Sequence, residues 1–126
     1  MKSDGSASPL QRLLRALSAT TSDYIIAIDS GGTIIFADDE VLRFLGRAMQ
    51  DLGKFTVEEV LYGADLAWVA RVIGRMSAGA PVSMPQQVHI ARKGKGVKTF
   101  SIFVWKHVAP DGEVAFVGLI DPQVVP

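Results

Sequence analysis

Apolar residues recur at helical spacing near the start of the chain. Four leucines follow the i, i+3, i+4, i+7 pattern of one face of a short amphipathic helix: Leu10, Leu13, Leu14 and Leu17. The pattern predicts a helix over residues 10–19, after a flexible Ser- and Gly-rich leader at residues 1–9. A helix of this length is marginal in isolation, so we expect its leucine side to dock on another surface.

The apolar period then changes to two. Residues 24–28 and 33–37 are rich in β-branched side chains and are joined by Asp-Ser-Gly-Gly, which predicts a tight hairpin with Asp29 bonding the turn amides. Further strands are predicted at residues 86–93, 97–108 and 114–121.

Helical signals occupy the middle of the chain. Acids at Asp38, Asp39 and Glu40 fit the cap and first turn of a helix within residues 39–49, and Gly46 is a candidate stop for it. Thr56 and Glu59 have capping-box spacing for a short helix over residues 56–63, and the longest helix is expected over residues 64–79. Two strands before this block and three after it predict an α+β fold: one five-stranded antiparallel sheet with helices across one face.

Both faces of the predicted sheet are apolar. Phe100, Ile102 and Val104 alternate with Phe103 and Trp105, whereas a sheet with one wet face shows polar alternation. Something must therefore cover the second face, and the N-terminal helix or a partner subunit is the simplest candidate.

Composition narrows the class of protein. The chain has 126 residues, enough for one domain, and its 13 basic and 13 acidic side chains cancel, so no global field attracts nucleic acid or an anionic membrane. It has no cysteine, which excludes disulfides and thiolate chemistry. No signal peptide and no run of about 18 apolar residues is evident, so we expect a soluble, cytoplasmic domain.

The motifs that could carry chemistry favour structural roles. The Ser-Gly-Gly at residues 30–32 precedes a strand and not a helix, which favours a hairpin turn over a phosphate loop. The acids at 38–40 favour helix capping over a metal site, and the basic hairpin at residues 92–98 favours a solvated loop over nucleic-acid binding. No triad, paired-acid or metal-ligand pattern emerges, so we expect no enzymatic activity and no metal.

The order of these motifs resembles the PAS domain family over residues 20–122. The segment DYIIAIDSGGTIIFADDEVLRFLGR is similar to the family's opening strand, hairpin and helix, and DLGKFTVEEVL, MSAGAPVS, IARKGKGVKTFSIFVW and DGEVAFVGLID resemble its later segments in sequence. The resemblance implies a PAS-like (profilin-like) fold, followed by a short tail at residues 123–126.

The resemblance also implies a signalling module that forms homodimers or binds partner proteins, and that regulates an output domain or partner. The four leucines of the first helix are the candidate dimer contact, and Asp121 occupies the position from which PAS domains pass a signal onward. An interior cavity would hold a small apolar ligand or be filled by side chains. The candidates for its lining are Ile26, Ile28, Ile35, Phe44, Leu45, Trp68, Val72, Val88, Ile90, Phe103 and Trp105.

A cofactor-binding redox or gas sensor is the alternative within this family. Heme-binding PAS domains commonly present a histidine from the long helix, and residues 64–79 contain none, which argues against heme. The two histidines, His89 and His107, are expected in strands. The absence of cysteine excludes covalent flavin photochemistry but leaves noncovalent flavin open, with Trp68 or Trp105 as stacking partners.

Overall fold

The computed structural model describes residues 9–21, 23–61, 63–80, 86–92 and 96–121, and the side chains of residues 91, 92, 96 and 97 are outside that description. The predicted leader, except Pro9, the C-terminal tail and the turn of the basic hairpin also lie outside it. The described helices are α1 (Pro9–Ser18), α2 (Asp39–Leu45) and α3 (Gly63–Ser77), with 3-10 turns η1 (Met49–Asp51) and η2 (Val57–Glu59). The strands are β1 (Tyr24–Ile28), β2 (Ile34–Ala37), β3 (Gln86–Arg92), β4 (Gly96–Val108) and β5 (Val114–Ile120).

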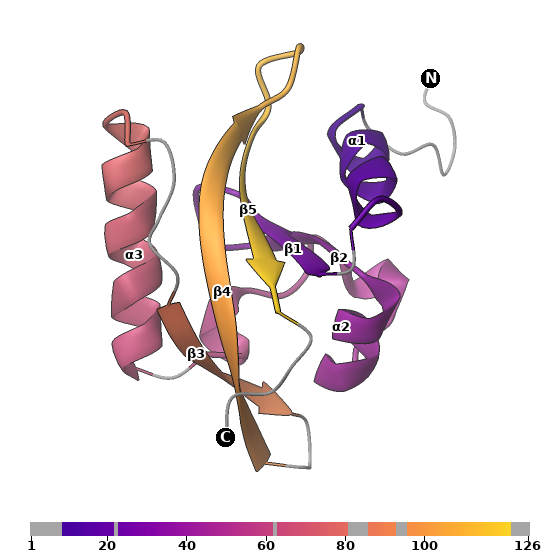
Figure 1. Ribbon diagram of the computed structural model, residues 1–126, viewed down its shortest axis with the longest axis vertical. Helices are drawn as coiled ribbons and strands as arrows, with labels where there is room; N and C mark the ends of the chain where they lie inside the picture. The colour runs from indigo at the N-terminus through magenta and orange to yellow at the C-terminus, as the bar shows by residue number, and fades with distance from the viewer. Residues whose placement is uncertain (1–8, 22, 62, 81–85, 93–95, 122–126) are drawn as a thin grey trace.

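The five strands form one antiparallel sheet in the order β2-β1-β5-β4-β3. This confirms the predicted α+β architecture. The first and last strands pair in the middle of the sheet, with Tyr24 opposite Ile120. Figure 1 shows α3 and α1 on opposite sides of the sheet. The sheet is therefore covered by helix on both of its faces.

The β1–β2 connection is the predicted hairpin turn. Asp29 Oδ1 accepts hydrogen bonds from the amides of Gly31 (2.9 Å) and Thr33 (3.0 Å), and Gly32 adopts φ 87°, a conformation that favours glycine. A phosphate loop is excluded because these amides are already bonded within the turn. The register shifts between Ala27 and Ile28, which marks a β-bulge in this pair of strands.

The helix that starts at Asp39 ends at Leu45, at the predicted Gly46 stop, because Gly46 turns left-handed (φ 72°) and its amide bonds back to Arg43 O. The next short helix differs from its prediction. The helix predicted over residues 56–63 is only the 3-10 turn η2, although Glu59 Oε2 accepts from the Thr56 amide at 3.1 Å as the capping box requires.

The sheet separates two apolar clusters. The inner cluster lies between the sheet and the helical block and includes Ile28, Leu45, Phe55, Val72 and Phe116. The outer cluster lies under α1 and is made by buried Leu10, Leu14, Ile25, Ala27, Phe36, Ala109, Ala115 and Val117. Both faces of the sheet are thus apolar, as the alternation along residues 100–105 indicated.

The leucine stripe of α1 is divided between the interior and the surface. Leu10 and Leu14 are each 1% exposed against the outer face, Leu17 is partly buried against the same cluster, and Leu13 is 44% exposed. This corrects the prediction that all four leucines form the dimer contact. Leu10 and Leu14 are buried within their own chain because they face the apolar side chains of β1 and β5, and only Leu13 is openly accessible.

Candidate ligand cavity and outer sheet surface

A cavity of about 70 Å³ lies inside the inner cluster. Strands β1, β3, β4 and β5 form its floor, and α2, η2 and α3 supply its walls. Helix α3 contributes Trp68, Val69, Val72 and Ile73 on one side because these residues return to the same face every three or four positions. The space exceeds the roughly 10–15 Å³ that one water molecule requires. Its lining is hydrocarbon apart from the Trp68 indole, so the site suits a small apolar guest.

Seven of the eleven predicted lining residues surround this cavity. They are Ile26, Ile28, Leu45, Trp68, Val72, Val88 and Ile90. Sequence reasoning did not assign several other lining residues, among them Val60, Val69, Ile73, Val104 and Phe116. Helical spacing could have predicted Val69 and Ile73, because both lie about one turn from other lining residues of α3.

Four predicted lining residues lie elsewhere. Phe103 and Trp105 belong to the outer face, where their rings are 6.0 Å apart, because β4 turns Phe100, Ile102 and Val104 inward. Ile35 packs with the outer cluster, since the bulge in the β1–β2 pair places Ile34 opposite Ile28.

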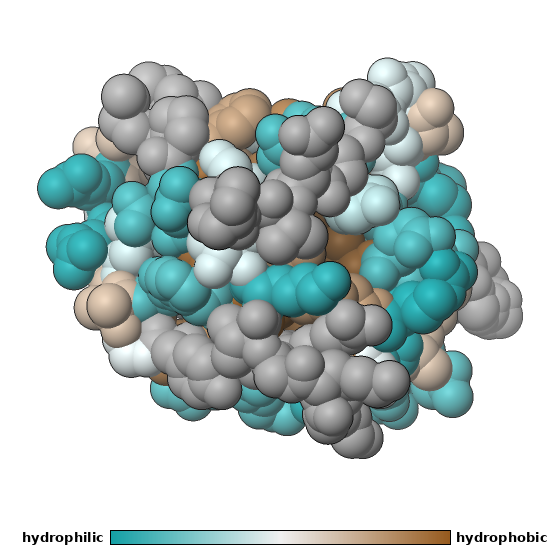
Figure 2. Space-filling view, turned by 60° about the horizontal axis from the view of Figure 1, so that its bottom comes forward, coloured by the Kyte–Doolittle hydropathy of each residue, from teal (hydrophilic) through white to brown (hydrophobic). Residues whose placement is uncertain are grey.

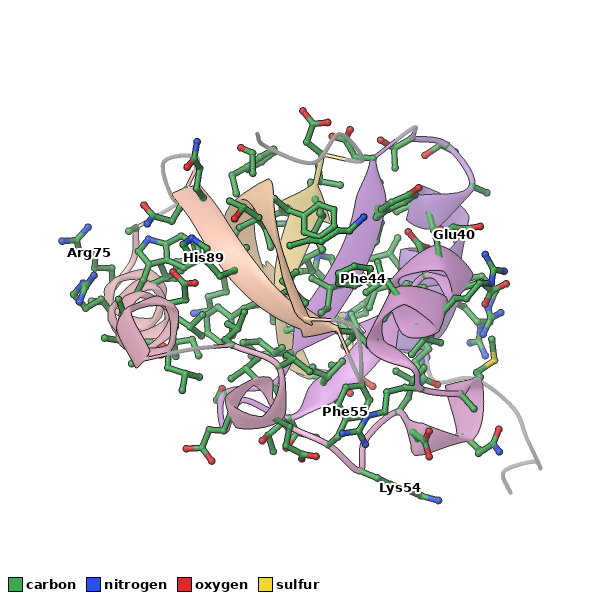
Figure 3. The ribbon with its side chains drawn as sticks, turned by 90° about the horizontal axis from the view of Figure 1, so that it is seen from below. Glu40, Phe44, Lys54, Phe55, Arg75 and His89 are labelled. Carbon is green, nitrogen blue, oxygen red and sulfur yellow. The ribbon has the colours of Figure 1, made fainter. Side chains whose placement is uncertain are left out.

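Phe44 contacts the inner cluster but does not line the cavity. It packs edge-on against Phe100 with a ring separation of 5.3 Å, and it lines a neighbouring recess instead. Figure 3 shows Phe44 projecting from α2 into the space beside β3.

Gly118 in β5 helps to create the cavity. It lies in the middle of the sheet, opposite Ile26 on β1 and Val104 on β4, and it lines the cavity floor. A Cβ at this position would lie 2.7 Å from Ile102 Cδ1 and 3.2 Å from Ile26 Cγ2. Any larger residue would therefore push side chains into the empty space.

A buried carboxylate at the start of α3 fixes this helix to the sheet. Asp65 is 6% exposed, and its Oδ2 accepts a hydrogen bond from the His89 amide at 2.7 Å. The same oxygen lies 2.9 Å from Nδ1 of the His89 ring, which is itself half exposed. Sequence analysis did not single out Asp65, because an acid in the first turn of a helix is usually explained by the helix dipole.

A second carboxylate connects three elements on the other side. Asp38 occupies the N-cap position of α2, as predicted, but its side chain does not bond the helix. Instead Asp38 Oδ1 accepts from the Ser18 hydroxyl at the end of α1, and Oδ2 accepts from the Ile25 amide of β1 at 2.6 Å. The expected capping role is thus replaced by a link between α1, β1 and α2.

The outer face carries a second candidate site, which we call the outer surface: Leu13, Leu17, Phe103, Trp105 and Leu119. Leu17, Trp105 and Leu119 are partly buried against the outer cluster, and Phe103 lies beside Trp105 and opposite Leu119. Helix α1 shields β1 and β5 but leaves these side chains accessible in part. The outer surface is an apolar strip along the edge of α1.

The charged groups near the sites are mostly neutralised by neighbours. Glu40 bonds Arg43 at 2.5 Å and thereby raises the pKa of the guanidinium. The Thr56 amide, and then Arg47, lower the pKa of Glu59. Within the described ranges no group of His, Asp and Glu side chains is arranged to hold a metal ion.

The cavity lining does not fit heme or flavin. An axial heme ligand would need a histidine, cysteine or methionine among the side chains that face the cavity, and those are aliphatic or aromatic. A flavin ring needs polar partners for its heteroatoms, and only Trp68 could supply one. No described helix has both the length and the hydropathy needed to cross a bilayer.

The predicted output residue, Asp121, follows β5, is exposed, and donates its backbone amide to Ser101 O at 3.0 Å.

Comparisons with known proteins identify the fold. No family model matches the sequence, and no curated protein matches it. Solved structures do match. A PAS domain from Colwellia psychrerythraea matches with a TM-score of 0.67 and 12% identity, over 88% of this chain and 93% of that one. PAS-B of Drosophila melanogaster Cycle with bound ethylene glycol matches with a TM-score of 0.65 and 15% identity, over 81% of this chain and 99% of that one. A domain of a sensory box sensor histidine kinase/response regulator from Geobacter sulfurreducens also matches, with a TM-score of 0.64 and 19% identity, over 87% of this chain and 91% of that one.

These neighbours define the class: the chain has the PAS fold. At 12–19% identity the likeness concerns the fold, and the predicted PAS architecture is confirmed.

Proposed function

We propose that this chain is a PAS-type signalling module, which senses a small apolar ligand in its interior and forms a homodimer, or binds a partner, through the outer surface. The observation that carries the proposal is that one sheet is apolar on both faces. A hydrocarbon-lined cavity lies on one face, and the partly exposed apolar strip lies on the other. The relation to sensor proteins supports it, since one structural neighbour is a domain of a sensor histidine kinase.

Strand β5 offers the physical link between the two faces. Gly118 lines the cavity, whereas Val117 and Leu119 face the outer cluster. A ligand that fills the cavity would press on the central strands. Their displacement would also move the side chains that they carry on the outer face. Because interfaces and packed cores change between discrete arrangements, a small shift of this kind can bias one dimer geometry over another.

The outer surface suits a contact between two copies. It is apolar, and α1 adds Leu13, which is 44% exposed. Burying a large aliphatic or aromatic side chain in a contact contributes about 1.5–3 kcal/mol. An output domain or partner protein could use the same strip, and Asp121 lies at the end of β5 where such a signal would leave the sheet.

The proposal includes no catalytic activity. The side chains that line the cavity provide no nucleophile and no general acid or base, so chemistry on a bound molecule has no carrier there. The second candidate function is an interaction module whose small cavity closes around no ligand. The size of the cavity, about 70 Å³, favours that candidate, and ligand binding separates the two.

Association is tested by changing the outer surface. We expect the double variant Leu13→Glu with Phe103→Glu to be monomeric in sedimentation equilibrium at concentrations where the unchanged chain is dimeric, since charge cannot be buried there without a partner. Met49→Glu is the matched control, because Met49 is an equally exposed apolar residue (47%) outside the outer surface. A dimer that persists in the double variant, or a monomeric unchanged chain, would contradict homodimerisation through this strip.

A further inference from the structure

A second recess adjoins the cavity, and we call it the vestibule. It measures about 180 Å³ and is lined by α2 (Glu40, Val41, Phe44) and by strand residues that include Ile90, Lys98 and Phe100. Val41, Ile90 and Ile120 line both the vestibule and the cavity. The two spaces therefore share these residues as part of their walls.

The two spaces have different chemistry. The cavity is hydrocarbon, whereas the rim of the vestibule carries the Lys98 ammonium, the Glu40 carboxylate and the Tyr24 ring with its hydroxyl. Figure 2 shows apolar surface in a recess framed by hydrophilic side chains. A molecule that fills both spaces would need one apolar end and one polar end.

The charges at the rim favour an anionic polar end. Glu40 is bonded to Arg43 at 2.5 Å, so its negative charge is offset locally. Lys98 is exposed, and within the described part of the chain no acidic side chain forms an ion pair with it. Among the residues that line the vestibule, Lys98 is therefore the charged group whose charge no neighbouring ion pair offsets.

The surrounding sequence strengthens this polarity. Residues 66–110 contain seven Lys and Arg residues and no Asp or Glu, although the chain as a whole is neutral. Strands β3 and β4 both lie within this stretch. The acidic groups near these strands, such as Asp65 and Glu40, come from other elements, and each has a bonded partner.

We propose that the ligand is a single-chain amphiphile with an anionic head group, such as a medium-chain carboxylate. Its head lies in the vestibule beside Lys98, and its alkyl chain passes Val41, Ile90 and Ile120 into the cavity. This inference rests on the proposed ligand-sensing function and specifies its ligand class.

The test follows the fluorescence of Trp68, which lines the cavity. In a Trp105→Phe background Trp68 is the only tryptophan, because the chain has two. This protein is titrated at low salt with decanoate, decanol and decyltrimethylammonium, which share a tail and differ in head charge. Calorimetric titration of the unsubstituted chain provides the same ranking without the background substitution.

We expect decanoate to bind about threefold more tightly than decanol, the range of one partly solvated charge contact, and decyltrimethylammonium to bind most weakly. Lys98→Gln should reduce decanoate binding to the level of decanol and leave decanol unchanged. Lys54→Gln is the control, since Lys54 is exposed and points away from the site in Figure 3. Raising the salt concentration should narrow the difference between decanoate and decanol.

The outcomes separate the two levels of the proposal. Saturable binding of all three amphiphiles with equal affinity, or no effect of Lys98→Gln, would overturn the anionic head group and leave the apolar cavity as a ligand site. No change in Trp68 emission and no heat with any of them would overturn this inference together with ligand sensing. Dimer formation is judged separately by sedimentation and is unaffected by either result.

Discussion

At the scale of single residues, Asp65 has the most specific role in positioning the cavity. Its buried carboxylate joins the first turn of α3 to β3, and both elements line the cavity. A buried acceptor of this kind costs little while its partners are present, but removing it leaves a backbone amide without a bond. The Asp65 carboxylate therefore adds a directional contact to the apolar packing that holds α3 on the sheet.

We expect Asp65→Ala to lower the free energy of unfolding by about 1–3 kcal/mol, because the His89 amide loses its acceptor. His89→Ala should cost less, under about 1 kcal/mol, since it removes only the half-exposed ring and keeps the amide bonded to Asp65. Urea unfolding of both variants measures the difference. Equal losses in the two variants would show that the amide bond is not the important contact.

Three acids, Asp29, Asp38 and Asp65, show how far sequence reasoning reaches at this scale. Asp29 was predicted correctly, because its partners are the next few amides of the same turn. Asp38 and Asp65 bond residues that are 13 and 24 positions away, and no local pattern announces such contacts. Asp38 and Asp65 both lie at helix starts, where a capping or helix-dipole role already accounts for an acid. The sequence therefore gives no reason to expect their tertiary contacts.

At the scale of elements, α1 is a helix whose stability comes from docking. Two of its leucines are almost fully buried on the outer face, and its end is tied to β1 and α2 through Ser18 and Asp38. A ten-residue helix without such contacts would be marginal in water. Whether α1 stays docked therefore controls how much of the outer face is exposed.

Neighbouring leucines of α1 provide a matched pair of substitutions. We expect Leu14→Ala to destabilise the domain by about 2–5 kcal/mol, or to release α1 while the sheet stays folded, because it removes a side chain that is 1% exposed. Leu13→Ala should change the free energy of unfolding by less than about 0.5 kcal/mol. Thermal unfolding and hydrogen exchange of residues 9–18 provide the measurements. A similar cost at both positions would contradict the observed docking of α1.

The order of the elements could be read from the sequence, because turn residues and apolar periods mark each of them locally. The faces of β4 could not, since alternation has no meaning when both sides of a strand are apolar. The predicted register therefore places Phe103 and Trp105 inside, and the structure places them outside. The predicted helix over residues 56–63 was wrong for a related reason: a capping box identifies a helical start and does not specify how many turns follow.

At the scale of the whole molecule, the cavity exists because the sheet and the helical block do not fill the space between them. Gly118 leaves the centre of the sheet without a side chain, and the aliphatic residues of α3 do not reach that point. Protein interiors are close-packed, so an unfilled space of this size is a cost that ligand binding can recover. The cavity is a property of how the layers meet and not of any one motif.

Filling this space provides a test of its role. We expect Gly118→Ala to displace Ile102 into the cavity and to weaken decanol binding about tenfold, while the free energy of unfolding changes by less than about 1 kcal/mol. Gly74→Ala is the control, because Gly74 lies on the exposed side of α3 with nothing near its added methyl group. It should leave binding unchanged and stabilise the helix slightly. Unchanged decanol affinity in the Gly118 variant would place the ligand elsewhere.

The pairing of β1 with β5 has a consequence for how this domain joins other polypeptide. Because Tyr24 lies opposite Ile120, the chain enters and leaves the sheet at one place, although 95 residues stand between them. The connection from α1 and the chain that follows β5 therefore start side by side. A twist between β1 and β5 would move α1 and the residues after Ile120 together.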